Sequence, residues 1–190
     1  EVGSDNTQRG RPPVKLEVNP TRFYLIAVEI DVGWIVVAIT TLVGEILVQR
    51  REEFRTHDYD FVLNLCVSTV DRLLRQQSIH RDDVLGIGVA VPGQVDLNRR
   101  VVTFAPNLRW RDVSLADDLE RDLNLPVLVS NEAMLGAMAE KWFGRGRDAG
   151  VLVYVSVKGG LGCGIVNDRS LFLGVSGSAG ELGHMSIDPK

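Results

Sequence analysis

Residues 23–50 read FYLIAVEIDVGWIVVAITTLVGEILVQR, and this stretch decides the fold. It contains three apolar, β-branched runs, which are Phe23–Asp31, Trp34–Thr41 and Glu45–Arg50. Short turns with a glycine join each run to the next, as in strands that pair with their neighbours in sequence. The stretch therefore predicts an antiparallel meander of three strands.

The rest of the chain alternates helical and strand patterns. Apolar spacing and capping residues predict helices over 58–77, 114–123 and 131–143, and apolar runs predict strands over 84–91, 101–104, 127–129, 151–157 and 163–166. The continuous apolar run at 84–91 is typical of a buried central strand. This order is that of an α/β, ribonuclease H-like lobe of the actin-like ATPase and sugar kinase type. We expect a linker at 1–20, this lobe at 21–145, and an incomplete second lobe that starts at 146–190.

Composition excludes several classes of protein. The 190 residues are 45% hydrophobic and 24% charged, which is ordinary for a globular protein, and the net charge of −4 argues against electrostatic nucleic-acid binding by the chain as a whole. Cys66 and Cys163 stand far apart in apolar contexts, so we expect buried free thiols rather than a disulfide. Because no apolar run approaches the roughly 18 residues of a membrane span, we expect a cytoplasmic protein without a membrane partner.

A glycine-rich stretch near the C-terminus, GSAGELGH at 177–184, combines a carboxylate with an imidazole. A helical turn would place Glu181 and His184 on one face, and glycines allow a ligand to approach the backbone closely. Such acceptors suit the hydroxyl groups of a sugar. The alternative is a plain glycine-rich loop with an exposed Glu181 and a His184 that caps another group.

Four stretches together resemble the ROK family of repressors and sugar kinases. They are VAVPGQVD at 89–96, APNLRWRD at 105–112, VSNEA at 129–133 with Ala139-Glu140, and GSAGELGH at 177–184. The resemblance covers about residues 20–190. It favours the transcriptional-regulator branch of the family, as a sugar-binding domain without its N-terminal winged helix-turn-helix.

The resemblance implies a ring of sugar-binding residues around a hexose or N-acetylhexosamine, or its phosphate. These residues are Asn107, Asn131, Glu132, Glu181 and His184. Each of the first three also has a structural interpretation, because Asn107 could hold a turn, Asn131 could be a helix N-cap, and Glu132 could favour a helix N-terminus. For Asn131 we expect both roles.

The resemblance also implies that His184 ligates a structural zinc together with three cysteines of a following segment. Neither Cys66 nor Cys163 lies in such a segment, so these residues cannot assemble a four-ligand site. We expect no required cofactor, and a zinc only in a full-length protein.

Two glycine-containing turns depart from the phosphate loops of family kinases. The first turn keeps Asp31 and Gly33 but carries Trp34 and Ile35 in place of a glycine and a threonine. The second turn, VKGGLGCG at 157–164, lacks the threonine but keeps much of the glycine, at Gly159, Gly160 and Gly162, and its Lys158 could still pair with a phosphate. These departures indicate that nucleotide binding is degraded.

A third departure concerns the base that would deprotonate the sugar. Family kinases have an aspartate where this chain has Glu132, whose carboxylate is displaced by about 1 Å or more by the extra methylene. A displacement of that size can lower a rate about 100-fold, whereas sugar binding tolerates it better. We therefore expect a sensor without catalytic residues, and Glu132 as the base if the protein is a kinase.

The N-terminal 20 residues are rich in polar residues and proline and include Arg9-Gly-Arg-Pro12. Arg9 and Arg11 could lie along a DNA minor groove as in an AT-hook, or the segment could be a solvated linker. Family repressors have such a linker after their DNA-binding domain, which suggests an excised C-terminal portion of a repressor. An N-terminal tail of an unusual kinase would also explain the segment.

The leading hypothesis is the sugar-sensing effector domain of a ROK-type repressor that controls DNA binding allosterically. Its partners would be a sugar, operator DNA through an N-terminal domain that this chain lacks, and further copies in a homodimer or dimer of dimers. The alternative is an ATP-dependent sugar kinase, similar to glucokinase or N-acetylmannosamine kinase. A third reading is a scaffold that binds neither sugar nor nucleotide.

Overall fold

The computed structural model describes residues 17, 19–174 and 179–186. Its largest element is a five-stranded sheet, here called the first sheet, with the strand order β3-β2-β1-β4-β8. The strands β1 (Tyr24–Asp31), β2 (Trp34–Thr41) and β3 (Ile46–Glu53) are antiparallel neighbours. The strands β4 (Val84–Val91) and β8 (Val127–Asn131) continue the sheet in parallel with β1.

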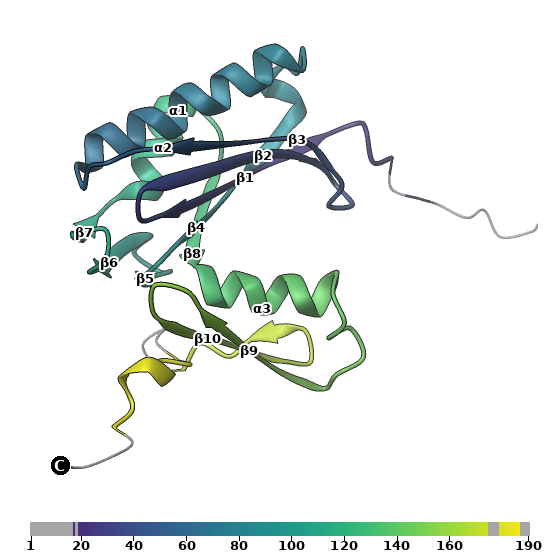
Figure 1. Ribbon diagram of the computed structural model, residues 1–190. Helices are drawn as coiled ribbons and strands as arrows, with labels where there is room; N and C mark the ends of the chain where they lie inside the picture. Colours follow the sequence, from purple (N-terminus) through teal and green to yellow (C-terminus); the bar gives the residue numbers. More distant parts are fainter. Residues whose placement is uncertain (1–16, 18, 175–178, 187–190) are drawn as a thin grey trace, which may run out of the picture.

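Two helices, α1 (Tyr59–Gln76) and α2 (Leu115–Leu123), cover one face of the first sheet (Figure 1). Side chains alternate between the two faces of a strand, so Ile26, Val28 and Ile30 of β1 point to these helices and are buried. The helix α1 begins where the carboxylate of Asp58 accepts a hydrogen bond from the backbone of Phe61 at 2.7 Å. Glu29 and Asp31 lie on the opposite face of β1, which this core leaves open.

The helix α3 (Glu132–Trp142) lies between the first sheet and a second sheet, here called the C-terminal sheet (Figure 1). The C-terminal sheet has the order β11-β10-β9, from β9 (Val151–Val157), β10 (Leu161–Asn167) and β11 (Ser170–Leu171). A small antiparallel sheet of β5 (Gln94–Asp96), β6 (Val101–Ala105) and β7 (Trp110–Val113) stands at the end of β4. Two short 3-10 helices, η1 (Arg81–Asp83) and η2 (Leu182–His184), complete the described elements.

Small residues allow α3 and the C-terminal sheet to pack closely. A Cβ atom on Gly164 would lie 2.4 Å from the backbone oxygen of Ala133 and 2.7 Å from the Cβ of Ala137. A Cβ atom on Gly136 would lie 2.6 Å from the ring of Tyr154. The glycines therefore fix how the β9–β10 hairpin sits against α3, and so they position the turn at 158–160.

The structure confirms the α/β fold with a ribonuclease H-like order of elements, the meander and all three helices. The strand β4 lies inside the first sheet, as predicted, and Ile87, Val89 and Val91 are buried on one of its faces. Gly88 and Ala90 on its other face are not buried, so the prediction of a buried central strand is confirmed for one face only. The sequence analysis missed β5 and β7, which are only three and four residues long. Ser114 stands at the N-cap of α2 but its side chain makes no capping hydrogen bond. The division of the chain at residues 145 and 146 stays a prediction.

The two cysteines are free and buried, as predicted. Burial raises the pKa of the Cys66 thiol to about 12, so this group is a core side chain rather than a nucleophile. Among the described residues, no helix is both long and apolar enough to cross a membrane. Most of the predicted linker, including Arg9 and Arg11, lies outside the described residues.

Candidate sugar site and its neighbouring groove

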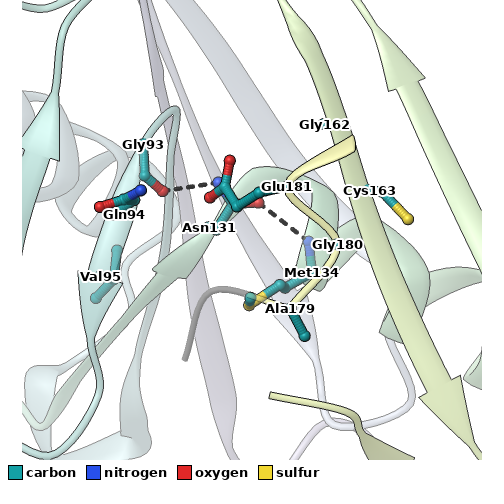
Figure 2. Close-up of a pocket in the computed structure, with 10 residues that line it drawn as sticks. All are labelled: Gly93, Gln94, Val95, Asn131, Met134, Gly162, Cys163, Ala179, Gly180 and Glu181. Carbon is teal, nitrogen blue, oxygen red and sulfur yellow. Dashed lines mark hydrogen bonds between the residues drawn. The ribbon is translucent and has the colours of Figure 1, made fainter. Parts of the chain in front are cut away.

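A small pocket of about 370 Å³, including the space at its mouth, lies where four segments meet (Figure 2). The segments are the start of β5, the N-terminus of α3, the strand β10 and residues 179–181. Its polar side chains are those of Gln94, Asn131 and Glu181, and glycine backbone completes much of the wall. Amide, carboxylate and backbone groups of this kind can pair with the hydroxyl groups of a sugar.

Asn131 is held firmly at the edge of the small pocket. Its side-chain oxygen accepts hydrogen bonds from the backbone of Ala133 at 2.8 Å and of Met134 at 3.3 Å, which makes it the N-cap of α3. Its side-chain nitrogen donates to the backbone oxygen of Gly93 at 2.7 Å. An amide nitrogen carries two N–H donors, so one donor of Asn131 remains for a ligand hydroxyl. The predicted capping role is confirmed, and the sugar-binding role stays a prediction.

Glu181 reaches the small pocket because the backbone before it makes a tight approach. Gly180 has a φ of +90°, and a Cβ atom there would lie 2.3 Å from the backbone oxygen of Cys163. Only glycine fits this position, which brings the carboxylate of Glu181 opposite Asn131 (Figure 2). Glu181 precedes the 3-10 helix that ends at His184, so the predicted turn exists, but the side chain of His184 lies outside the described part.

Glu132 lines a different cavity from Asn131, although the two residues are adjacent. This cavity, here called the groove, encloses about 1,170 Å³, including its mouth, between the open face of β1, β2 and β4 and the elements α3 and β9. Lys158 and Glu29 line it as well. Burial raises the pKa of the Glu132 carboxyl group, and the positive charge of Lys158 opposes that rise.

The first glycine turn is closed by contacts within the chain. The carboxylate of Asp31 accepts a hydrogen bond from the backbone of Val32 at 2.7 Å, and the backbone oxygen of Gly33 accepts one from Phe54 at 2.8 Å. The guanidinium of Arg51 lies over the indole of Trp34, 4.2 Å from the ring centroid. Ile35 is fully buried in the core. The position that would carry a phosphate-binding hydroxyl thus holds an apolar core side chain.

The second glycine turn connects β9 to β10. The backbone nitrogen of Lys158 donates to the backbone oxygen of Gly160 at 3.1 Å, which closes the turn. A Cβ atom on Gly162 would lie 3.0 Å from that of Ala133, so the turn also approaches α3. A Cβ atom on Gly159 would lie 4.0 Å from the side-chain nitrogen of Asn107, which is otherwise exposed between β6 and β7.

The structure therefore divides the predicted ring of sugar ligands. Asn131 and Glu181 share the small pocket, Glu132 lines the groove, and Asn107 lies beside the turn at Gly159. The sequence analysis did not single out Gln94 or Glu29. Both stand out in retrospect as polar residues in apolar stretches, since Glu29 is the one charged residue of β1 before its last position.

The described residues do not fit a zinc site. No three His, Cys, Asp or Glu side chains gather there in a way that could hold a metal ion. Cys66 belongs to the core of the first sheet, and burial raises the pKa of both cysteine thiols, which disfavours the thiolate that zinc requires.

The family profile described as "ROK family" matches residues 25–190. The chain belongs to the ROK family. The match includes both glycine turns, the small pocket and the groove, and it confirms the resemblance inferred from the four motifs.

Repressors and kinases of the ROK family both resemble the chain. It is 38% identical over 189 residues to a putative xylose repressor of Caldicellulosiruptor sp. (strain Rt8B.4), covering 99% of the chain and 47% of that protein. The crystal structure of a ROK family transcriptional regulator, a homologue of the Escherichia coli MLC protein, matches with a TM-score of 0.84 and 31% identity, covering 96% of this chain and 46% of that one.

A kinase of the family has nearly the same fold. A ROK family glucokinase from Streptomyces griseus, solved in complex with glucose and AMPPNP, matches with a TM-score of 0.79 and 30% identity. The match covers 87% of this chain and 51% of the glucokinase. The chain spans about half the length of the curated relative named above and of a second xylose repressor that it matches. Fold alone therefore does not separate the repressor from the kinase.

Proposed function

We propose that the chain is the sugar-sensing part of a ROK transcriptional repressor and that the small pocket binds a neutral monosaccharide. The observation that supports this proposal is that the side chains of Asn131 and Glu181 line the same glycine-rich pocket. A fixed amide donor and a carboxylate acceptor suit a ligand with several hydroxyl groups, because a mismatched epimer would leave a buried polar group unpaired. The predicted effector was a hexose or N-acetylhexosamine, or its phosphate, and the repressor relatives add xylose to the candidates.

The first glycine turn supports a sensor rather than a kinase. Trp34 stacks under Arg51 and Ile35 is buried, so this turn offers a phosphate neither a second glycine nor a hydroxyl. Both side chains instead make contacts within the chain, Trp34 with Arg51 and Ile35 with the core. As further parts of the proposal, no cofactor is required, and the protein is cytoplasmic.

The small pocket also supplies a route to allosteric control. Its wall comes partly from the N-terminus of α3 and partly from β10 and residues 179–181, so a bound sugar favours one arrangement of these elements. A sugar can regulate DNA binding only through its difference in affinity for two arrangements. Operator DNA, bound through a winged helix-turn-helix of the whole protein, and a homodimer or dimer of dimers are the partners we propose.

Thermal-shift titration against xylose, hexoses and N-acetylhexosamines, each with and without Mg-ATP, tests the proposal. A sugar that binds the folded state at 100 times its Kd stabilises that state by about 2.7 kcal/mol, which raises the melting temperature. We expect one sugar to do so and Mg-ATP to have no effect. Glu181→Gln should abolish the sugar shift, whereas Glu53→Gln, whose side chain is 82% exposed on β3, should keep it.

One observation favours the alternative of an ATP-dependent sugar kinase. Glu132 is partly buried at the start of α3, and its raised pKa is the direction expected of a general base. If Mg-ATP stabilises the protein and ATP turnover depends on a sugar and on Glu132, the kinase replaces the sensor. If neither sugar nor nucleotide binds, the hypothesis of a scaffold protein replaces both the sensor and the kinase hypotheses.

A further inference from the structure

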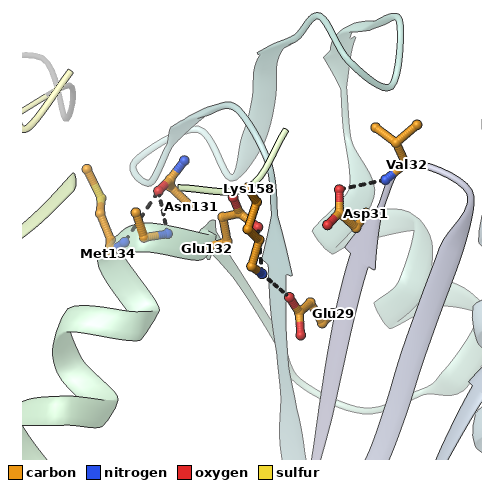
Figure 3. Close-up of polar contacts among 8 residues, drawn as sticks. Glu29, Asp31, Val32, Asn131, Glu132, Met134 and Lys158 are labelled. Carbon is orange, nitrogen blue, oxygen red and sulfur yellow. Dashed lines mark hydrogen bonds and ion pairs between the residues drawn. The ribbon is translucent and has the colours of Figure 1, made fainter. Parts of the chain in front are cut away.

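Lys158 connects two parts of the chain that are far apart in sequence. From the β9–β10 turn its side chain crosses to the open face of β1, where its Nζ atom lies 2.8 Å from Oε1 of Glu29 (Figure 3). The same Nζ atom lies 3.5 Å from Oε2 of Glu132 at the start of α3. One ammonium group thus joins the first sheet, α3 and the C-terminal sheet at the groove.

The charges around this ammonium group are unbalanced. Glu29 and Glu132 contact it, and the carboxylate of Asp31 is close enough for its charge to act on both Lys158 and Glu132. Three carboxylates and one ammonium leave a net charge of about −2 in this part of the groove. A negative field of this kind repels a polyphosphate and tolerates a neutral sugar in the neighbouring pocket.

Carboxylates of the chain itself already occupy the ammonium group of Lys158. An ammonium group has three N–H donors, and the contacts to Glu29 and Glu132 engage two of them. The contact to Glu29 is the shorter and has the better hydrogen-bonding distance. The side chains of this pair are exposed to 45% for Lys158 and 36% for Glu29, so solvent and salt screen the charges of the pair.

We propose that Glu29 is the specificity-determining residue of the groove, because its carboxylate takes the place at Lys158 that a phosphate oxygen would need. Glu29 thereby excludes polyphosphate ligands such as nucleoside triphosphates. The ammonium group of Lys158 lies in a glycine-rich turn, but it binds Glu29 of the first sheet and so connects that sheet to the C-terminal sheet. The inference rests on the proposed function in one respect, which is that the small pocket receives an uncharged ligand.

Isothermal titration with sodium tripolyphosphate at low ionic strength tests this inference directly. Glu29→Gln removes one negative charge and keeps the size of the side chain, so Lys158 becomes available to the probe. We expect binding at least about tenfold tighter than to the unchanged protein, with an affinity that falls as salt is added. The matched control is Glu53→Gln, which removes an equal charge from β3 and should bind no more tightly than the unchanged protein.

Two further variants decide whether Lys158 is the group that binds. Adding Lys158→Gln to Glu29→Gln should return the affinity to that of the unchanged protein. Glu29→Ala should repeat the gain if Gln at this position disturbs the fold, which circular dichroism would reveal. Equal affinity of Glu29→Gln and Glu53→Gln, or tight binding by the unchanged protein, overturns the inference.

The sugar titration separates this result from the proposed function. If Glu29→Gln gains tripolyphosphate binding and no sugar shifts the melting temperature of either protein, Glu29 determines specificity and the sensor proposal fails. If a sugar binds and Glu29→Gln gains nothing, the sensor proposal stands and the role of Glu29 is refuted.

Discussion

The first sheet and the C-terminal sheet are built from similar β-branched strands, yet they bury those strands very differently. In β2 the side chains of Ile35, Val37 and Ile39 are at most 1% exposed beneath α1. In β9 the four alternating valines at positions 151, 153, 155 and 157 are between 48% and 77% exposed. The difference shows that the same pattern of β-branched residues buries its side chains only where another element covers the strand.

The two regions also treat their carboxylates differently. In the helices that cover the first sheet, Asp118 of α2 accepts a hydrogen bond from the hydroxyl of Tyr59 of α1 at 2.6 Å, and the pKa of Asp118 lies below its ordinary value. At the groove, burial raises the pKa of Glu132 despite the nearby Lys158. Asp118 thus stabilises the fold in its ionised form, whereas burial disfavours the ionised form of Glu132, as is common at binding sites.

Valine-to-alanine substitutions in the two sheets should differ most in how far they lower the free energy of unfolding. Val37→Ala removes two buried methyl groups from β2 and should lower the free energy of unfolding by roughly 2–3 kcal/mol. Val153→Ala in β9 removes methyl groups that are 57% exposed and should cost less than about 1 kcal/mol. Urea unfolding curves of the two variants measure both values. Equal losses would show that the outer face of β9 is covered in solution.

A substitution at the contact of α3 with the C-terminal sheet should have an intermediate effect. Gly164→Ala places a Cβ atom 2.4 Å from the backbone oxygen of Ala133, so the hairpin must shift, at a cost of about 1–3 kcal/mol. Gly160→Ala is the control, because nothing lies within 4 Å of its Cβ position. Hydrogen exchange should show lost protection in β9 and β10 but not in β2 for Gly164→Ala. Lost protection in β2 as well would mean that the two sheets unfold together.

The smallest expected effect is a change in the pH dependence of stability. The hydrogen bond from Tyr59 and then the contacts with Arg121 lower the pKa of Asp118 in the folded state. A lowered pKa adds stability above the ordinary value of 3.8, and this stability is lost as the pH falls through the lower folded value. In urea unfolding, Asp118→Asn should therefore be less stable than the unchanged protein at pH 7. The difference in the free energy of unfolding between the two proteins should become smaller toward pH 2.

The control for this pH experiment lies in the same helix. Asp117, whose side chain is 59% exposed and 3.5 Å from Arg100, stands outside the contacts of Asp118. Urea unfolding at pH 7 and pH 2 should show a smaller difference in the free energy of unfolding between Asp117→Asn and the unchanged protein. This difference should also change less with pH. A gap for Asp118→Asn that stays constant with pH would show that the hydrogen bond, and not the charge, stabilises the helices.

Much of the fold could be predicted because local pattern and tertiary structure agree. The alternation in β1 and β2 and the capping residues Asp58 and Asn131 are set by contacts within a few residues. The short strands β5 and β7 could not be found this way, since three or four residues carry no periodicity. The exposed face of β4 was missed because an apolar run does not reveal which of its faces another element covers.

The sequence by itself determined the family, the order of the elements and the residue types of the candidate site, because motifs and periodicity are properties of neighbouring residues. Only the tertiary structure separated Asn131 from Glu132, since a helix start directs adjacent side chains into different cavities. It also brought Glu29 to Lys158 across 129 positions of sequence. No local pattern contains that contact, which exists because the glycines at 136 and 164 let the hairpin dock closely on α3.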